Sequence, residues 1–205
     1  MGSAVLSDGC LPETIIRAAA VIQAGGVVAF PTETYYGLAV DPFNDEALQR
    51  LFEIKKRPFC KPILVLINTY KQLPLLVDSI PVQYQNIMEQ FWPGPLTLIF
   101  PAKAGVSTIL TGNTDTVGVR ISSNPVAQRL VASTGIPITA TSANLSGENP
   151  ASSPSEVRQQ FGEQLDMIID GGMTRGGCGS TIVGFAAKSL QIIRAGVISA
   201  SRLGI

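Results

Sequence analysis

Basic side chains gather in one short stretch of this 205-residue chain. Residues 50–61 hold five of the 15 basic residues against one acid, Glu53. A helix over residues 45–56 would place Lys55 inside its apolar stripe, where a lysine must extend to solvent or meet an anion. Pro58 disfavours helical backbone at Arg57 and turns it towards whatever Lys55 faces. A solvated helix end, where the helix dipole favours cations, explains the cluster equally well.

A second candidate site lies on the segment Thr116–Ile121, which alternates as a strand does. Thr116, Gly118 and Arg120 share one face. A glycine there leaves backbone open to a ligand, and arginine binds carboxylate or phosphate through two parallel donors. An exposed arginine on a solvent-facing strand is the alternative.

Small hydroxyls and one amide follow the apolar strand expected at residues 136–140. Ser142 and Asn144 belong to this run, at the strand end where α/β proteins often bind ligands. The same residues could form an ordinary turn. The glycine-dense loop 171–179 could offer backbone N–H groups to phosphate, although it matches neither a Walker A loop nor a Rossmann fingerprint.

Composition narrows the chemistry further. The chain has no histidine, which excludes imidazole acid–base catalysis, Ser-His-Asp triads and the common zinc motifs. Fifteen acids balance the 15 basic residues, so no overall field draws the protein to nucleic acid or membrane. Cations, hydroxyls and open backbone favour binding a polyanion. Phosphoryl or nucleotidyl transfer fits, since positioning and electrostatics carry most of that catalysis.

Three separated cysteines, Cys10, Cys60 and Cys178, indicate reduced, partly buried thiols in a cytoplasmic protein rather than a metal site. The longest apolar run, Ile63–Ile67, is far too short to cross a membrane. We therefore expect no resident metal and no membrane partner.

The hydrophobic pattern predicts one α/β domain over residues 1–205, with its core at about 12–200. Proline, glycine and capping residues predict helices from residue 12 to 24, at 45–56 with Asn44 as cap, at 81–91 and 124–133, and at 154–161 with Ser153 or Ser155 as cap. Apolar runs predict strands at 27–30, 63–67, 96–100, 116–121, 136–140, 166–169, 180–185 and 190–194.

Short motifs in a fixed order then carry a resemblance that runs from about residue 12 to 200. They are Pro31-Thr-Glu-Thr-Tyr-Tyr-Gly-Leu38, Lys55-Lys-Arg-Pro58, Trp92-Pro-Gly-Pro-Leu-Thr97, Asp115-Thr-Val-Gly-Val-Arg120, Ser142-Ala-Asn-Leu-Ser-Gly147, Ser180-Thr-Ile182 and Arg194-Ala-Gly196. The chain thus resembles the YrdC/TsaC family of threonylcarbamoyl-AMP synthases. Each motif is weak alone, whereas the ordered series is highly specific.

The resemblance implies a twisted, open mixed α/β sheet with helices around a large, positively lined cavity. It implies synthesis of threonylcarbamoyl-AMP and pyrophosphate from L-threonine, bicarbonate and ATP, with Mg²⁺ accompanying ATP. A separate transferase machinery then passes the threonylcarbamoyl group to the adenosine beside the anticodon in tRNAs that read codons beginning with A. The chain looks like the short, single-domain form, and tRNA itself is a further candidate partner.

The same resemblance implies roles for individual residues. Threonine would be held by Thr32, Arg120, Ala140 and Ser180. Lys55, Arg57, Ser142 and Asn144 would be catalytic and would bind ATP together with Thr116 and Arg194, and Tyr36 would form part of the cavity wall. Leu66 replaces a histidine of several relatives, and Lys61 stands where some have asparagine. An RNA-binding module and a catalytically silent nucleotide-binding paralogue are the competing interpretations.

Overall fold

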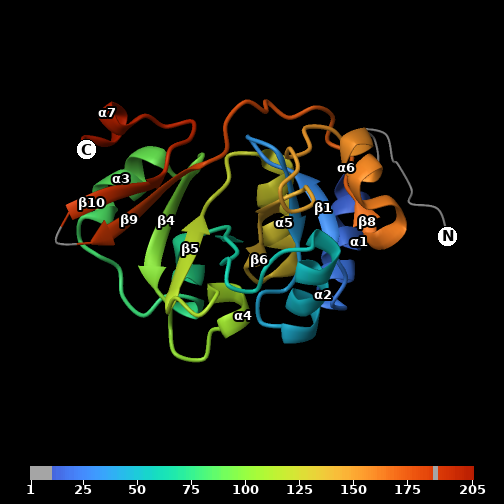
Figure 1. Cartoon of the computed structure of the whole chain (residues 1–205), viewed down its shortest axis with the longest axis horizontal. Coiled ribbons are helices and arrows are strands. Elements are labelled where there is room, and N and C mark those ends of the chain that lie inside the picture. The colour runs from blue at the N-terminus through green and yellow to red at the C-terminus, as the bar shows by residue number, and fades with distance from the viewer. Residues whose placement is uncertain (1–10, 187–188) are drawn as a thin grey trace.

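In the computed structural model the strands form two mixed sheets joined by helices and loops (Figure 1). The structure describes residues 11–186 and 189–205. One sheet has the order β7-β2-β1-β8 and the other β10-β9-β4-β5-β3-β6, and each contains parallel and antiparallel pairs. The expected mixed α/β class is confirmed. The strands divide into two sheets, however, where one open sheet was expected.

The element bounds follow most of the predicted segments. The strands are β1 Val28–Pro31, β2 Tyr36–Ala39, β3 Val65–Leu66, β4 Leu96–Pro101, β5 Thr116–Arg120, β6 Ile138–Thr139, β7 Thr141–Ser142, β8 Met167–Ile168, β9 Thr181–Ala186 and β10 Ser189–Arg194. The helices are α1 Leu11–Gln23, α2 Asp45–Lys55, α3 Tyr84–Phe91, α4 Thr108–Thr111, α5 Pro125–Thr134, α6 Pro154–Phe161 and α7 Ala200–Leu203, with 3₁₀ turns η2 Tyr70–Leu75 and η3 Gly162–Gln164.

Capping side chains set the start of three helices, two of which have a cap that the sequence predicts. Asn44 accepts a hydrogen bond from the Ala47 N–H at 3.1 Å before α2, and Asn124 caps α5 in the same way. The Ser153 hydroxyl accepts from the Glu156 N–H before α6, so Ser153 rather than Ser155 is the cap. Each cap satisfies an N–H group that the first helical turn leaves unpaired.

Two apolar clusters hold the sheets and helices together. The smaller one joins α1 and α5 to β1, with Ile15, Ile22 and Leu130 fully or almost fully buried. The larger one contains residues of both sheets and of helices α2, α3 and α6. In Figure 1, β4, β5, β9 and β10 with α3 form one side of the molecule, while β1, β8, α1 and α6 form the other.

Strand β2 is the main element that the sequence analysis missed. All four of its residues are buried, and it pairs with β1 through a turn at residues 32–35. The strand has no alternation to reveal it, and Gly37 is closely packed, since a Cβ atom there would lie 3.1 Å from the Phe30 ring. Helix α4 and the short strand β7 were missed as well, and β3 and β6 are shorter than predicted.

Strand β5 shows the predicted alternation, but its glycine serves packing. Val117 and Val119 are buried on one face. On the other face a Cβ at Gly118 would clash with the side chain of Leu64, so a protein side chain covers this backbone instead of a ligand. Arg120 is only 5% exposed, which excludes the solvent-facing alternative.

The cysteine prediction fails for the two residues that can be assessed. Cys60 and Cys178 are exposed free thiols rather than partly buried ones, because both lie in loops. Cys10 lies outside the described residues.

Four connections converge where the two sheets face each other. They are the turn 32–35, the loop 56–64 after α2, the loop that follows β7, and the glycine-rich segment 170–180. The last of these leaves β8 and crosses from one side of the molecule to the other before β9 begins (Figure 1). The fold therefore brings the sequence motifs to one place, although they lie far apart along the chain.

Candidate active site

A pocket of about 540 Å³ lies between the two sheets. Most of the residues that the sequence analysis singled out line it: Thr32, Tyr36, Arg57, Arg120, Ala140, Ser142, Ser180 and Arg194. Lys61, whose role was left open, lines it as well. Lys55, Thr116 and Asn144 do not.

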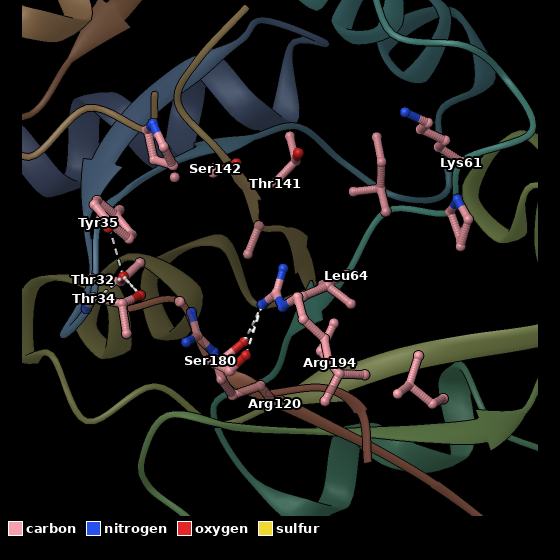
Figure 2. Close-up of a pocket in the computed structure, with 18 of the residues that line it drawn as sticks. Thr32, Thr34, Tyr35, Lys61, Leu64, Arg120, Thr141, Ser142, Ser180 and Arg194 are labelled. Carbon is pink, nitrogen blue, oxygen red and sulfur yellow. Dashed lines mark hydrogen bonds between the residues drawn. The ribbon is translucent and has the colours of Figure 1, made fainter. Parts of the chain in front are cut away.

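Arg120, Ser180 and Arg194 form one corner of the pocket (Figure 2). Arg194 Nη2 donates to the Ser180 carbonyl at 2.8 Å and lies 3.1 Å from its Oγ. The Ser180 hydroxyl also lies 3.0 Å from Thr97 Oγ1. These contacts fix Ser180 and one edge of Arg194, so the corner is organised without a ligand.

Two glycines allow Arg194 and Ser180 to come this close. A Cβ at Gly196 would overlap the backbone of residues 179–181, and a Cβ at Gly179 would lie 3.2 Å from Arg194 Nη2. Arg194-Ala-Gly196 is therefore a packing motif as well as a source of charge, since only glycine fits against that backbone.

Two positively charged side chains, Arg120 and Arg194, lie close together in this corner. Burial lowers the pKa of Arg120, and the nearby carboxylate of Glu33 partly offsets this. Burial also lowers the pKa of Arg194, and the charge of Arg120 lowers it further. Like charges held this close in a partly desolvated pocket favour an anionic ligand.

Arg57 lies in the loop that follows α2. Its Nε donates to the Lys61 carbonyl at 3.2 Å and its Nη2 to the Pro62 carbonyl at 2.9 Å. The helix ends just before Arg57, because Lys56 is its C-cap and has a left-handed backbone with a φ of +50°. Arg57 thus lines the pocket, whereas Lys55 does not.

Lys55 is buried, with 1% of its surface exposed. Its ammonium donates to the main-chain carbonyls of Ser142 and Asn144, the latter at 2.7 Å. Burial lowers its pKa to about 7, and the charge of Arg57 adds to the shift. The lysine of the apolar stripe therefore neither reaches solvent nor meets an anion of the chain, because two carbonyls take that place.

Asn144 and Ser142 form a small closed network beside Lys55. The Ser142 hydroxyl donates to Asn144 Oδ1 at 2.6 Å, and Asn144 Nδ2 donates to the carbonyls of Leu145 and Glu148. All polar atoms of the Asn144 side chain are thus engaged in holding the loop. Ser142 remains the member that lines the pocket.

Thr116 lies away from the main pocket, although it shares a strand face with Arg120. It lines a second, mostly apolar pocket of about 210 Å³ and contacts Thr114 Oγ1 at 2.9 Å. Four residues of extended chain span about 13 Å, so a shared face does not bring both side chains to one ligand. Thr116 therefore lies apart from the pocket in which its contact with ATP was expected.

Tyr36 joins the pocket wall to the glycine-rich segment. Its hydroxyl donates to the Gly172 carbonyl at 2.8 Å and accepts from the Gly171 N–H. Burial raises its pKa to about 12, so the phenol stays protonated at neutral pH. Because the N–H groups of Gly171, Gly176 and Cys178 have partners within the protein, the segment offers less to a phosphate than its sequence suggests.

Glu33 is the residue that sequence reasoning missed. It belongs to the Pro31–Leu38 motif, yet no role was assigned to it. Its carboxylate accepts from Arg120 Nη1 at 3.0 Å and from the Ser122 hydroxyl. An acid between two threonines was the available signal, but its partner lies 87 residues away in the other sheet.

Neither a metal centre nor a membrane span is found in the described part of the chain. Residues 11–186 and 189–205 contain no group of three histidine, cysteine or acidic residues placed to hold a metal ion. Over the same residues, no helix is both long and apolar enough to cross a bilayer.

Comparison with known proteins agrees with this geometry. The family model described as "Telomere recombination", which covers Sua5, YciO and YrdC, matches residues 20–196. The chain belongs to this Sua5/YciO/YrdC family. The resemblance inferred from the ordered motifs is thereby confirmed.

Named members of the family include two threonylcarbamoyl-AMP synthases. The one from Pyrococcus abyssi is 39% identical over 179 residues, which are 87% of this chain and 53% of that protein. The one from Idiomarina loihiensis is 44% identical over 147 residues, 71% of this chain and 79% of that protein.

A solved structure of P. abyssi Sua5 complexed with L-threonine superimposes with a TM-score of 0.88 at 38% identity, over 90% of this chain and 54% of that one. The family fold is therefore shared in detail. The chain spans about half the length of the Pyrococcus family member.

Proposed function

We propose that this protein makes L-threonylcarbamoyl-AMP and pyrophosphate from L-threonine, bicarbonate and ATP. The observation that carries the proposal is the corner formed by Arg120, Ser180 and Arg194, in a chain similar to a protein crystallised with L-threonine. The two synthases named above support the same activity.

Threonine would occupy the corner of the pocket. Arg120 would receive the carboxylate, since a guanidinium offers paired donors that match it. Thr32, Ala140 and Ser180 line the same pocket and would contact the rest of the amino acid. Tyr36 would serve as wall, because its phenol is engaged with the backbone.

The ATP phosphates would lie along Arg57, Ser142 and Arg194, with Lys61 as a further cation at the pocket. Lys55 and Asn144 would act on this site by holding Ser142, the residue that both of them contact. Of the four residues expected to be catalytic, Arg57 and Ser142 would therefore face the substrate, whereas Lys55 and Asn144 would be positioning residues.

The reaction requires no histidine. The threonine amine and bicarbonate form a carbamate with loss of water, and a carbamate oxygen then attacks the α-phosphorus of ATP as pyrophosphate leaves. The nucleophile is already an anion, so this step needs no strong base. Arg57 and Arg194 would stabilise the charge that develops on the phosphates.

Mg²⁺ would enter as part of the ATP substrate. The described residues present no carboxylate cluster to hold the ion, which suits an ion bound mainly by phosphate oxygens and water. The protein's own contribution is then to orient the phosphates with guanidinium groups.

We further propose that the product passes to a separate transferase that modifies the adenosine beside the anticodon in tRNAs reading codons beginning with A. The site of action would be the cytoplasm. This part of the proposal rests on the family resemblance.

Pyrophosphate release from the purified protein tests the activity. Release should require L-threonine, bicarbonate and ATP together, and omission of any one should reduce it to background. Equal release without threonine or without bicarbonate would contradict the assignment. Tight tRNA binding that weakens steeply with salt, in the absence of ATP and threonine, would favour the RNA-binding module instead.

Replacing Arg120 with lysine tests the orientation of the substrates. The variant keeps the charge but loses the paired donors, so the KM for threonine should rise about tenfold to a hundredfold while the KM for ATP changes less than about threefold. A larger effect on ATP than on threonine would overturn the proposed positions. Arg129→Lys, the same change at an exposed residue of α5, should leave both constants unchanged.

A further inference from the structure

Glu33 links the two sheets through its ion pair with Arg120, which belongs to the corner formed by Arg120, Ser180 and Arg194. It lies in the turn between β1 and β2 of the four-stranded sheet, whereas its partner Arg120 ends β5 of the six-stranded sheet. The two side chains are 15% and 6% exposed. One carboxylate oxygen accepts from Arg120 Nη1 and the other from the Ser122 hydroxyl. Glu33 is thus fixed through both oxygens.

Hydrogen bonds within the turn that carries Glu33 fix its conformation. The Thr32 N–H and hydroxyl both donate to the Tyr35 carbonyl, at 3.1 and 2.6 Å. The Thr34 N–H donates back to Thr32 Oγ1 at 3.2 Å. Glu33 therefore projects from a closed turn, and its carboxylate can hold another side chain in place.

Arg120 needs such a support. Its Nε is buried and has no hydrogen-bond partner among the described residues, which is unfavourable for a charged group. The neighbouring charge of Arg194 adds repulsion, as the lowered pKa of Arg194 reflects. The position of Arg120 is thus unfavourable for the guanidinium itself, and the bond to Glu33 is what opposes its departure.

We propose that Glu33 is a positioning residue for substrate recognition: it holds Arg120 close to Arg194 so that both guanidinium groups face one anionic ligand, the carboxylate of the amino-acid substrate. The inference rests on the proposed function, in which Arg120 receives that carboxylate. The Ser122 hydroxyl supports Glu33 by donating to its other carboxylate oxygen.

Glu33 could instead act against substrate binding, and the two roles predict opposite changes in threonine affinity when its charge is removed. If Glu33 merely repelled or competed with the substrate carboxylate, removing its charge would strengthen threonine binding. If it positions Arg120, removing the charge weakens threonine binding, because Arg120 is then free to move away from Arg194. Glu33→Gln separates these cases, since the amide keeps the size of the side chain and can still accept a hydrogen bond.

Calorimetric titration with L-threonine, and separately with ATP, is the test. For Glu33→Gln the Kd for L-threonine should rise at least about tenfold, whereas the Kd for ATP should change less than about threefold. L-threoninamide, which lacks the carboxylate, should bind the variant and the wild type alike. Glu163→Gln, the same change at an exposed residue of η3, should behave as wild type.

Ser122→Ala provides a second variant that keeps the ion pair. It should weaken L-threonine binding in the same direction by a smaller factor. Unchanged or tighter L-threonine binding in Glu33→Gln would overturn the inference, and so would equal losses for L-threonine, L-threoninamide and ATP, which would indicate general damage. Failure of the wild type to bind L-threonine would refute the proposed function and the inference together.

Discussion

Arg120 and Lys55 are both buried cations, yet the protein balances their charges in different ways. Arg120 is paired with the carboxylate of Glu33, whereas Lys55 meets only the carbonyls of Ser142 and Asn144. A guanidinium cannot release its proton at any ordinary pH, so its charge needs a counter-charge. An ammonium can release one, and a neutral amine keeps two N–H donors for two carbonyls. Arg120 is thus built to stay charged, and Lys55 to hold a loop.

The largest effect should come from removing Arg120 altogether. Arg120→Ala would leave Glu33 buried without its partner, and the free energy of unfolding should fall by about 3–5 kcal/mol. Urea denaturation measures this loss. Adding Glu33→Gln to the same chain should recover part of it. A loss no larger than that of an exposed ion pair would show that Arg120 and Glu33 are not the buried pair described above.

A smaller effect, which depends on pH, should follow from Lys55→Met. Burial lowers the pKa of Lys55 from 10.5 to about 7, so between these values the folded chain binds fewer protons than the unfolded chain. Lys55 should therefore make the wild-type free energy of unfolding rise with pH between about 7 and 10.5, and this gain is absent below about pH 7.

Methionine removes this titration and leaves two carbonyls unpaired, at a cost of about 2–4 kcal/mol. The variant should be less stable than wild type at pH 9, and the difference should narrow at pH 6. Denaturation curves of both proteins at the two pH values provide the measurement. An equal difference at both would mean that Lys55 does not change its protonation on folding.

The exposed ion pair between Arg50 and Asp166 sets the lower end of the scale. Its side chains are 41% and 35% exposed, and Asp166 also accepts from the Val27 N–H. Arg50→Ala should cost less than about 1 kcal/mol, and high salt should reduce the cost further. A loss as large as that of Arg120→Ala would show that burial does not govern these pairs.

Local rules predicted much of the fold. Apolar runs located most strands, and Asn44 and Ser153 marked two helix starts because capping depends on residues within one turn. The strand alternation placed Arg120 on the same face as Gly118. The division into two sheets was not predictable in this way, since it depends on pairing between distant segments such as β1 with β8 and β4 with β9.

The sequence indicated which side chains gather at the pocket better than it indicated the contacts that these side chains make. Arg120, Ser180 and Arg194 do meet in one pocket, whereas Thr116 lines a second pocket. Lys55 was expected to face the ATP phosphates, and its ammonium donates to two main-chain carbonyls that no side-chain pattern reveals. The role of Glu33 was not predictable from the sequence, because its partner Arg120 lies in the other sheet.

Identification of the product tests the central claim most directly. The purified protein would be incubated with ATP, L-threonine and isotopically labelled bicarbonate, and the nucleotides analysed by mass spectrometry. A threonylcarbamoyl adenylate that carries the label, formed together with pyrophosphate, is the predicted result. Formation of AMP or pyrophosphate without a labelled threonine-containing adenylate would contradict the account.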